Sequence, residues 1–318
     1  MSNLTFDSLP LRKDGPPGNA WGRFGDDDQL GTLNFLTPEN TREASKEIRE
    51  GTRIPTDWPL GSMARPCFGR SPLEHVIKHK EPRTVNDDML HFNTQSSSQW
   101  DGFRHFGYQR EKLYYNEMRQ DEMTATNKNG IHAWVDRGGI AGRGVLIDYA
   151  AWCDTRGLTP DFFATTPIQA STLQEIAKEQ GLTLRHADIL LVRTGWMRAY
   201  QNSTNEEKTH LASLQPPPAI GLETSEETVR WLWDTGFAAV AGDQPSFEAW
   251  PCAAGQGDPT SLHEWLLAGW GCPIGELFDL ERLSEECRKR NRYSFFFTSM
   301  PLHVVGGVAS PPNGMAIF

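Results

Sequence analysis

Short apolar segments that alternate with helix-forming segments constrain the fold of this chain more than any other feature. Residues 144–148 (GVLID) and 188–193 (DILLVR) are short, rich in aliphatic residues and bounded by turns, as buried strands are. Between them, residues 171–181 predict a capped helix. Residues 225–234 predict a second capped helix, which leads into the apolar strand 237–243 (FAAVAGD). This alternation predicts an α/β fold.

The two ends of the chain contain further helix and strand signals. Thr37 followed by Pro38 is typical of a helix start, and this helix should stop at Gly51. Residues 280–290 predict another helix. The tail, residues 293–318, predicts two or three strands joined by turns that contain Pro and Gly.

No linker long enough to divide the chain is visible, so one mixed α/β domain is expected. Residues 1–20 are polar and rich in Pro and Gly, which indicates an N-terminal arm, and residues 21–318 form the predicted domain. Residues 53–90 suit strands and loops. Residues 202–218 (NSTNEEKTHLASLQPPP) predict a loop insertion.

Composition excludes several classes of protein. The 318 residues include 38% apolar residues, which is enough for a sizeable core, and a formal net charge of −10 without a basic stripe argues against nucleic-acid binding. No segment approaches the roughly 18 consecutive apolar residues of a membrane helix. The five cysteines lack CxxC spacing, which indicates free thiols in a reducing compartment. We therefore expect a cytoplasmic protein without a nucleic-acid or membrane partner. A small-molecule substrate is implied by the family resemblance described below.

Residues 94–106 (TQSSSQWDGFRHF) interleave polar groups with large aromatic residues. In an extended conformation Gln95, Gln99, Asp101 and His105 would point to one face, because side chains alternate along a strand. Gln95 and Gln99 would then lie roughly 13 Å apart. A shared site therefore requires a bend in the chain, which the small residues of the three-serine run and Gly102 would allow. A polar strand edge with a well-bonded Asp and His explains the same pattern, and both interpretations stay open.

Two further stretches carry candidate polar residues. Glu276 lies among apolar neighbours, and a carboxylate that is buried there needs a metal or an Arg as its partner. His263 opens an apolar segment, where a bonded core or surface histidine is the ordinary explanation. Asp243 closes a strand, where functional loops often begin, although a turn explains it equally well.

The spacing of these residues carries a resemblance to a known family. The signature HxGTHxDxPxH has four functional positions, which fall on Gln95, Gln99, Asp101 and His105. A downstream His and Glu about a dozen residues apart fall on His263 and Glu276, and the closing pattern matches PLHVVGGVASPP. The chain thereby resembles the cyclase family that includes bacterial kynurenine formamidase and isatin hydrolase. The segment WGRFGDDDQLGTLNFLTPE resembles a longer, largely fungal branch of that family.

The resemblance implies a fold, a cofactor and roles for individual residues. The implied fold is a swivelling β/β/α domain that forms a homodimer or homotetramer. One divalent metal ion would be held by Asp101, His263 and Glu276, with His105 as general acid and base beside Asp101. The implied reaction is hydrolysis of a small amide, lactam, lactone or ester by metal-activated water.

Gln95 and Gln99 depart from the family signature, which has histidine at both positions. An amide oxygen is a weaker, harder and neutral ligand than an imidazole nitrogen. The metal could stay on the other three ligands with waters, or the glutamine oxygens could also be ligands. Both of these arrangements rank above a third one, in which the glutamines bind substrate and no metal is present. Manganese or zinc is the expected ion, with magnesium as a third candidate.

Two alternatives to hydrolysis stay open. One is a non-hydrolytic cyclase, dehydratase or isomerase of secondary metabolism, and the other is a non-catalytic small-molecule-binding relative. Candidate substrate-binding residues lie near the signature and near the N-terminus, and each aromatic one is equally explicable as core. These are Trp21, Trp100, Phe103, Arg104 and Tyr108.

Overall fold

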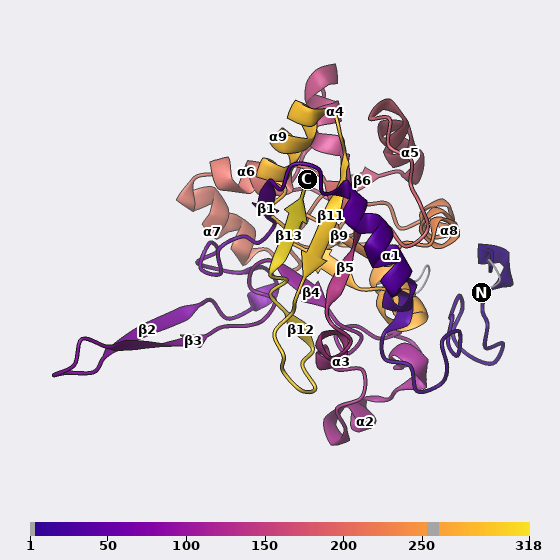
Figure 1. The fold of residues 1–318 in the computed structure, drawn as a ribbon, viewed down its shortest axis with the longest axis horizontal. Coiled ribbons are helices and arrows are strands. Elements are labelled where there is room, and N and C mark those ends of the chain that lie inside the picture. The colour runs from indigo at the N-terminus through magenta and orange to yellow at the C-terminus, as the bar shows by residue number, and fades with distance from the viewer. Residues whose placement is uncertain (1–3, 253–260) are drawn as a thin grey trace.

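A nine-stranded mixed sheet forms the centre of the molecule (Figure 1). The computed structural model describes residues 4–252 and 261–318. The strand order is β1-β13-β11-β5-β7-β9-β10-β4-β12. These strands are β1 (Arg53–Pro55), β4 (Gln99–Asp101), β5 (Ile140–Asp148), β7 (Ile189–Arg193), β9 (Ala239–Gly242), β10 (Ile274–Glu276), β11 (Ser294–Ser299), β12 (Ala309–Ser310) and β13 (Gly314–Ile317).

The middle of the sheet is parallel and is built from the segments whose alternation was noted in the sequence. Strands β5, β7, β9 and β10 pair in parallel, and β4 then pairs antiparallel with β10. All five residues of β7 are buried, as a strand covered on both faces requires. The predicted α/β fold is confirmed.

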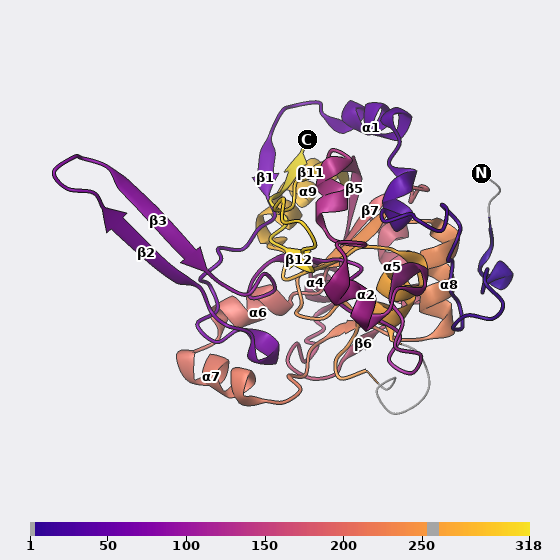
Figure 2. The same cartoon turned by 90° about the horizontal axis from the view of Figure 1, so that it is seen from below.

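Helices cover both faces of the sheet. Figures 1 and 2 show α1 on one face, packed on β5, and α4, α5 and α8 on the other. The helices are α1 (Pro38–Ala44), α2 (Gln120–Ala125), α3 (His132–Asp136), α4 (Tyr149–Arg156), α5 (Ala170–Glu179), α6 (Trp196–Asn202), α7 (Asn205–Ser213), α8 (Glu226–Thr235) and α9 (Glu281–Arg290), with a π-helical segment at Glu264–Trp270.

Helix starts follow side-chain capping. Thr37 Oγ1 accepts from the backbone N–H of Asn40 at 3.3 Å and begins α1, as the sequence predicted. The helix ends at Ala44 and continues only as a short 3-10 turn, well before Gly51. The loop predicted for residues 202–218 is wrong in part, because this segment contains α7.

A reciprocal cap explains why α7 forms in that segment. Thr204 Oγ1 accepts from the backbone N–H of Glu207, and the Glu207 carboxylate accepts from the backbone N–H of Thr204. The spacing Thr-x-x-Glu was therefore a helix signal within a segment that otherwise looks like a loop.

Residues 4–20 lie along the body of the protein. The indole of Trp233 on α8 donates to the carbonyl of Leu4, and the backbone N–H of Phe6 donates to Asp234. Asn19 and Ala20 are buried. The boundary at residue 20 between an arm and a domain stays a prediction.

Strands β2 (Glu74–His79) and β3 (Asn86–His91) form a hairpin that extends far from the body (Figure 2). In the sequence, the hairpin begins shortly after Arg70 and ends shortly before Gln95. A second small sheet pairs β6 (Pro167–Ile168) with β8 (Gly221–Leu222). Within the described ranges, no helix combines the length and the apolar character that crossing a membrane requires.

Candidate active site

Two short antiparallel strands place three of the predicted polar side chains on one face of the sheet. Gln99 of β4 pairs directly with Glu276 of β10, and Asp101 lies two residues further along β4. Because side chains alternate along a strand and directly paired residues share a face, all three point to the same side. Trp100, which lies between Gln99 and Asp101, points to the opposite side and is buried in the core.

A bend before β4 brings Gln95 to the same site. The backbone of Ser96 closes a turn there, so the three serines do not continue a straight strand. Gln95 Nε2 lies 2.6 Å from Asp101 Oδ1 and 3.2 Å from the ring nitrogens of His105. The bend expected at the serines is confirmed, and it removes the separation that a straight strand would impose.

Both glutamines direct their amide nitrogen at a carboxylate. Gln95 Nε2 donates to Asp101 as above, and Gln99 Nε2 donates to Glu276 Oε2 at 2.6 Å. Gln99 Oε1 accepts from Arg70 Nη1 at 3.5 Å, a long contact that favours the same amide orientation. In this arrangement the glutamines stabilise carboxylates as donors. The role of Gln95 and Gln99 as metal ligands, which requires the amide oxygen to face an ion, stays a prediction.

His263 is held by a carboxylate that the sequence did not single out. Glu248 is fully buried, and its two oxygens accept from the backbone N–H of His263 at 3.2 Å and pair with Nδ1 at 2.7 Å. The opposite ring nitrogen, Nε2, lies 3.1 Å from Glu276 Oε1 and 3.8 Å from Asp101 Oδ2. Burial lowers the pKa of His263, but the charges of Glu248, Asp101 and Glu276 outweigh burial and raise it well above its usual value.

Asp101 Oδ2 is a buried oxygen with no hydrogen-bond partner among the described residues. The Nε2 atoms of His263 and His105 lie 3.8 Å and 3.9 Å away, beyond hydrogen-bond distance. Donor atoms of Asp101, His105 and His263 all lie within 4.8 Å of one another. Two atoms that share one ion at about 2.1 Å each lie at most about 4.2 Å apart. The Nε2 atom of His263 lies within this limit of both Asp101 Oδ2 and Glu276 Oε1, so Asp101, His263 and Glu276 suit one divalent cation, with His105 beside them.

The two site carboxyls differ in how they hold a proton. Burial and the nearby charge of Asp101 raise the pKa of Glu276 to about 7. Burial also raises the pKa of Asp101, but its interactions with His105 and His263 outweigh burial, so the pKa of Asp101 lies below the usual value. Burial lowers the pKa of His105 to about 4, against the opposing effect of Asp101. His105 is therefore neutral at pH 7 and able to accept a proton.

A pocket of about 310 Å³ opens onto these groups. Four predicted site residues line it, namely Gln95, His105, His263 and Glu276, while Asp101 and Gln99 are buried behind them. The side chain of His105 keeps 21% of its surface exposed and that of Asp101 none. The remaining lining residues were not predicted. Phe106 directly follows His105, and the others come from loops far from it in the sequence: Phe68, Arg70, Pro245, Ser246 and Trp250.

The five predicted substrate-binding residues do not line this pocket. Trp21, Trp100, Phe103 and Tyr108 are at most 2% exposed and belong to the hydrophobic core. Arg104 points elsewhere and donates to the backbone carbonyls of residues 306, 123 and 126. Nearness in sequence to the signature therefore does not give nearness to its polar face, and a substrate-binding role for these residues stays a prediction.

Asp243 stabilises a turn between β7 and α6. Its carboxylate accepts from the backbone N–H groups of Thr194 and Gly195 and from the Thr194 hydroxyl, at 2.6 to 2.9 Å. These bonds fix the turn that leads into α6. Asp243 does not line the pocket.

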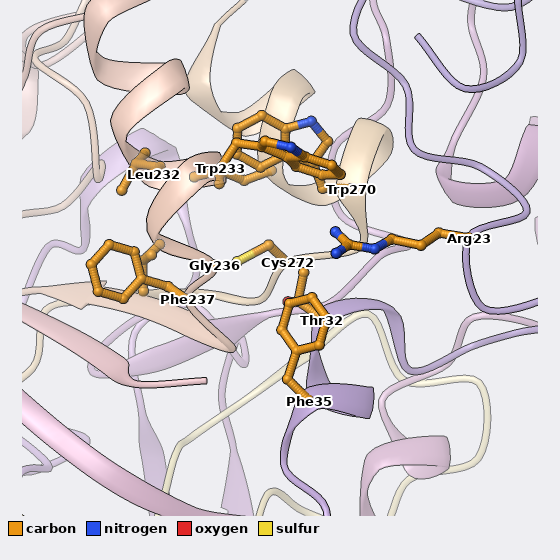
Figure 3. Close-up of a pocket in the computed structure, with 11 residues that line it drawn as sticks. Arg23, Thr32, Phe35, Leu232, Trp233, Gly236, Phe237, Trp270 and Cys272 are labelled. Carbon is orange, nitrogen blue, oxygen red and sulfur yellow. The ribbon is translucent and has the colours of Figure 1, made fainter. Parts of the chain in front are cut away.

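A second cavity lies beside α8 and holds only about 10 Å³, which is room for a single water at most (Figure 3). Figure 3 shows the guanidinium group of Arg23 between aromatic rings. Its Cζ atom lies 4.7 Å from the ring centre of Trp233, 4.9 Å from that of Phe35 and 5.4 Å from that of Phe24. This cavity is a packing feature and not a ligand site.

The fold and this site define an α/β protein with buried carboxylates and imidazoles at the base of an aromatic pocket. The sequence profile of the family described as "Putative cyclase" matches residues 41–249, which is more than half of the chain. The chain belongs to this cyclase family, as its resemblance predicted. Among curated proteins, none matches the sequence.

Solved structures share the fold. A crystal structure described as a novel cyclase is 28% identical, covers 94% of this chain and 99% of that chain, and superposes with a TM-score of 0.83. Isatin hydrolase A from Ralstonia solanacearum is 14% identical over 88% of this chain and 97% of its own, with a TM-score of 0.59. Isatin hydrolase A from Labrenzia aggregata, bound to benzyl benzoate, is 13% identical over 86% of this chain and 94% of its own, with a TM-score of 0.56.

Proposed function

We propose that this protein is a metal-dependent hydrolase of a small amide, lactam, lactone or ester. The observation that carries the proposal is Asp101 Oδ2, a buried and unpartnered carboxylate oxygen that faces the Nε2 atoms of two histidines at the base of a pocket. A buried charge of this kind needs a counter-ion. The family membership of the chain supports the same assignment.

Asp101, His263 and Glu276 are the proposed ligands of one divalent ion. Glu248 bonds Nδ1 of His263 and leaves Nε2 directed at both ligand carboxylates, which is the usual support of a metal-bound histidine. Two carboxylates with one imidazole suit manganese or zinc. Such an ion polarises a carbonyl oxygen and lowers the pKa of water.

His105 is the proposed general acid and base. Both His105 and His263 line the pocket, but the side chain of His105 is 21% exposed and that of His263 only 7%, so His105 is the imidazole more open to a substrate. Its neutral form at pH 7 takes a proton from the attacking water and then donates it to the leaving nitrogen or oxygen. Gln95 Nε2 contacts both side chains and keeps them in position.

One observation favours a second candidate function, a non-hydrolytic acid–base enzyme such as a cyclase, dehydratase or isomerase. The amide donors of Gln95 and Gln99 already bond the two carboxylates, and Glu276 with a pKa of about 7 can keep a proton. Such a site would move protons between Glu276, His105 and an organic substrate.

Isotope incorporation separates the two functions. A panel of small amides, lactams, lactones and esters is incubated with the protein in ¹⁸O-labelled water, and products are analysed by mass spectrometry. Hydrolysis predicts one labelled oxygen in each product carboxylate. Turnover that gives an unlabelled product overturns the hydrolase and supports the second candidate.

A further inference from the structure

Arg70 places a positive charge in the wall of the active-site pocket. It follows the short 3-10 turn Cys67–Gly69, and its side chain is half-buried among the lining residues. Arg70 is the lining residue with a permanent positive charge, whereas the two histidines of the lining titrate. A guanidinium in this position would favour a substrate with an anionic group.

Most of the hydrogen-bonding capacity of Arg70 is unused within the described ranges. Nη1 donates to the carbonyl of Gln95 at 2.9 Å and makes the long contact to Gln99 Oε1. Nε and Nη2 have no hydrogen bond, and no described carboxylate lies within ion-pair distance of the group. An arginine fork with two free donor sites matches the geometry of a carboxylate.

Aromatic side chains surround this cation. Cζ of Arg70 lies 5.0 Å from the ring centre of Phe68, and the Phe68 ring meets Trp250 edge-on at 6.1 Å. Across the pocket, Phe106 packs on His263 at 5.3 Å. These rings suit a flat apolar body, and Arg70 suits an anionic group at one end of it.

We propose that Arg70 binds a carboxylate on the substrate, so that the enzyme selects small planar molecules that carry a carboxylate in addition to the bond that is cleaved. The inference rests on the proposed function, because the divalent ion offsets the charges of Asp101 and Glu276 that would otherwise repel an anion. Arg104, a candidate substrate-binding residue from the sequence, is not available for this role, because it donates to backbone carbonyls.

The test compares binding of benzoate and nitrobenzene, two flat probes of nearly equal shape that differ in charge and contain no bond that the proposed hydrolase would cleave. Isothermal titration calorimetry is run on manganese-loaded protein, for the wild type and for Arg70→Gln, Arg70→Lys and Arg65→Gln. Arg65 is exposed, lies five residues earlier and makes no ion pair in the described part of the chain, so its variant removes the same charge outside the pocket.

Wild type and Arg65→Gln should bind benzoate about tenfold or more tightly than nitrobenzene, since a charged hydrogen bond contributes at that level. Arg70→Gln should remove this preference, and Arg70→Lys should keep part of it because lysine retains the charge without the fork. If Arg70→Gln fails to fold, Arg70→Lys still tests the proposal. An undiminished preference for benzoate in Arg70→Lys would show that the two-donor geometry of the guanidinium is not the basis of selection.

Two outcomes overturn the proposal. Equal binding of both probes by the wild type shows that the pocket does not select anions. A preference that persists in Arg70→Gln shows that the carboxylate binds the metal ion instead. Binding is measured without turnover, so an Arg70-dependent preference in a protein that hydrolyses nothing would refute the hydrolase proposal and leave Arg70 as an anion receptor.

Discussion

At the scale of single residues, the site contains side chains that line the pocket and buried side chains that hydrogen-bond to them and fix their positions. His105 and Glu276 line the pocket, whereas Glu248 is sealed beneath it and bonds His263 through both of its oxygens. Gln95 and Gln99 stabilise the carboxylates by donating to them. Removing a pocket-facing group and removing a supporting group should therefore give different kinetic signatures.

His105→Gln should lower kcat by about 10²–10⁴-fold and leave the fold intact, because it removes the proposed general acid and base. Steady-state kinetics on a substrate from the hydrolysis panel, together with circular dichroism, measure both effects. His75→Gln, on the exposed strand β2, is the matched control and should keep full activity. Undiminished turnover in His105→Gln would refute its assigned role.

Glu248→Gln should weaken metal affinity by about 10–100-fold, because the carboxylate that orients His263 becomes a neutral amide. Metal titration followed by calorimetry measures the affinity directly. Glu227→Gln removes a carboxylate on the exposed face of α8 and should leave the affinity unchanged. Equal affinities in both variants would contradict the supporting role of Glu248.

The imidazole of His105 should stay neutral at pH 6.5, where an ordinary histidine protonates. Burial lowers the pKa of His105 to about 4, so its basic form is present above that pH and is lost as the pH falls through about 4. A bound cation would lower this pKa further and keep the same sign. An NMR titration of the His105 ring from pH 4 to pH 8, assigned with His105→Gln, measures this pKa, and a midpoint near 6.5 would contradict this account of His105.

At the scale of elements, the sequence predicted strands and helices whose signal is local. The strands β5 and β7 follow from apolar runs, and the helix α8 follows from the capping residue Ser225. The conformation of residues 91–105 could not be predicted, because the bend in this segment depends on packing against parts of the chain that are far away in the sequence. The serine hydroxyls show this, since Ser98 bonds the backbone at residues 58 and 277.

Arg23→Ala should destabilise the packing of the N-terminal segment on α8 by about 1–2 kcal/mol, because it removes cation–π contacts with Phe24, Phe35 and Trp233. Chemical denaturation measures the free energy of unfolding. Arg42→Ala, on the exposed side of α1, should change it by less than about 0.5 kcal/mol. Equal effects of the two substitutions would show that the aromatic contacts contribute nothing.

At the scale of the whole molecule, the pocket is assembled from segments that the sequence keeps far apart. The signature positions could be found from their spacing, and the structure brings all six predicted polar residues to one site. Glu248, Arg70 and Trp250 could not be found in this way, because their function depends on which loops meet above the sheet. Assembly into a homodimer or homotetramer stays a prediction for light scattering to measure.

Metal content of the purified, untagged protein tests the central claim most directly. Inductively coupled plasma mass spectrometry before and after chelation should find about one manganese or zinc per chain. Chelation should abolish hydrolysis, and adding the ion back should restore it. A stably folded protein that contains no metal, rebinds none on titration and retains its activity in the chelator would contradict the account.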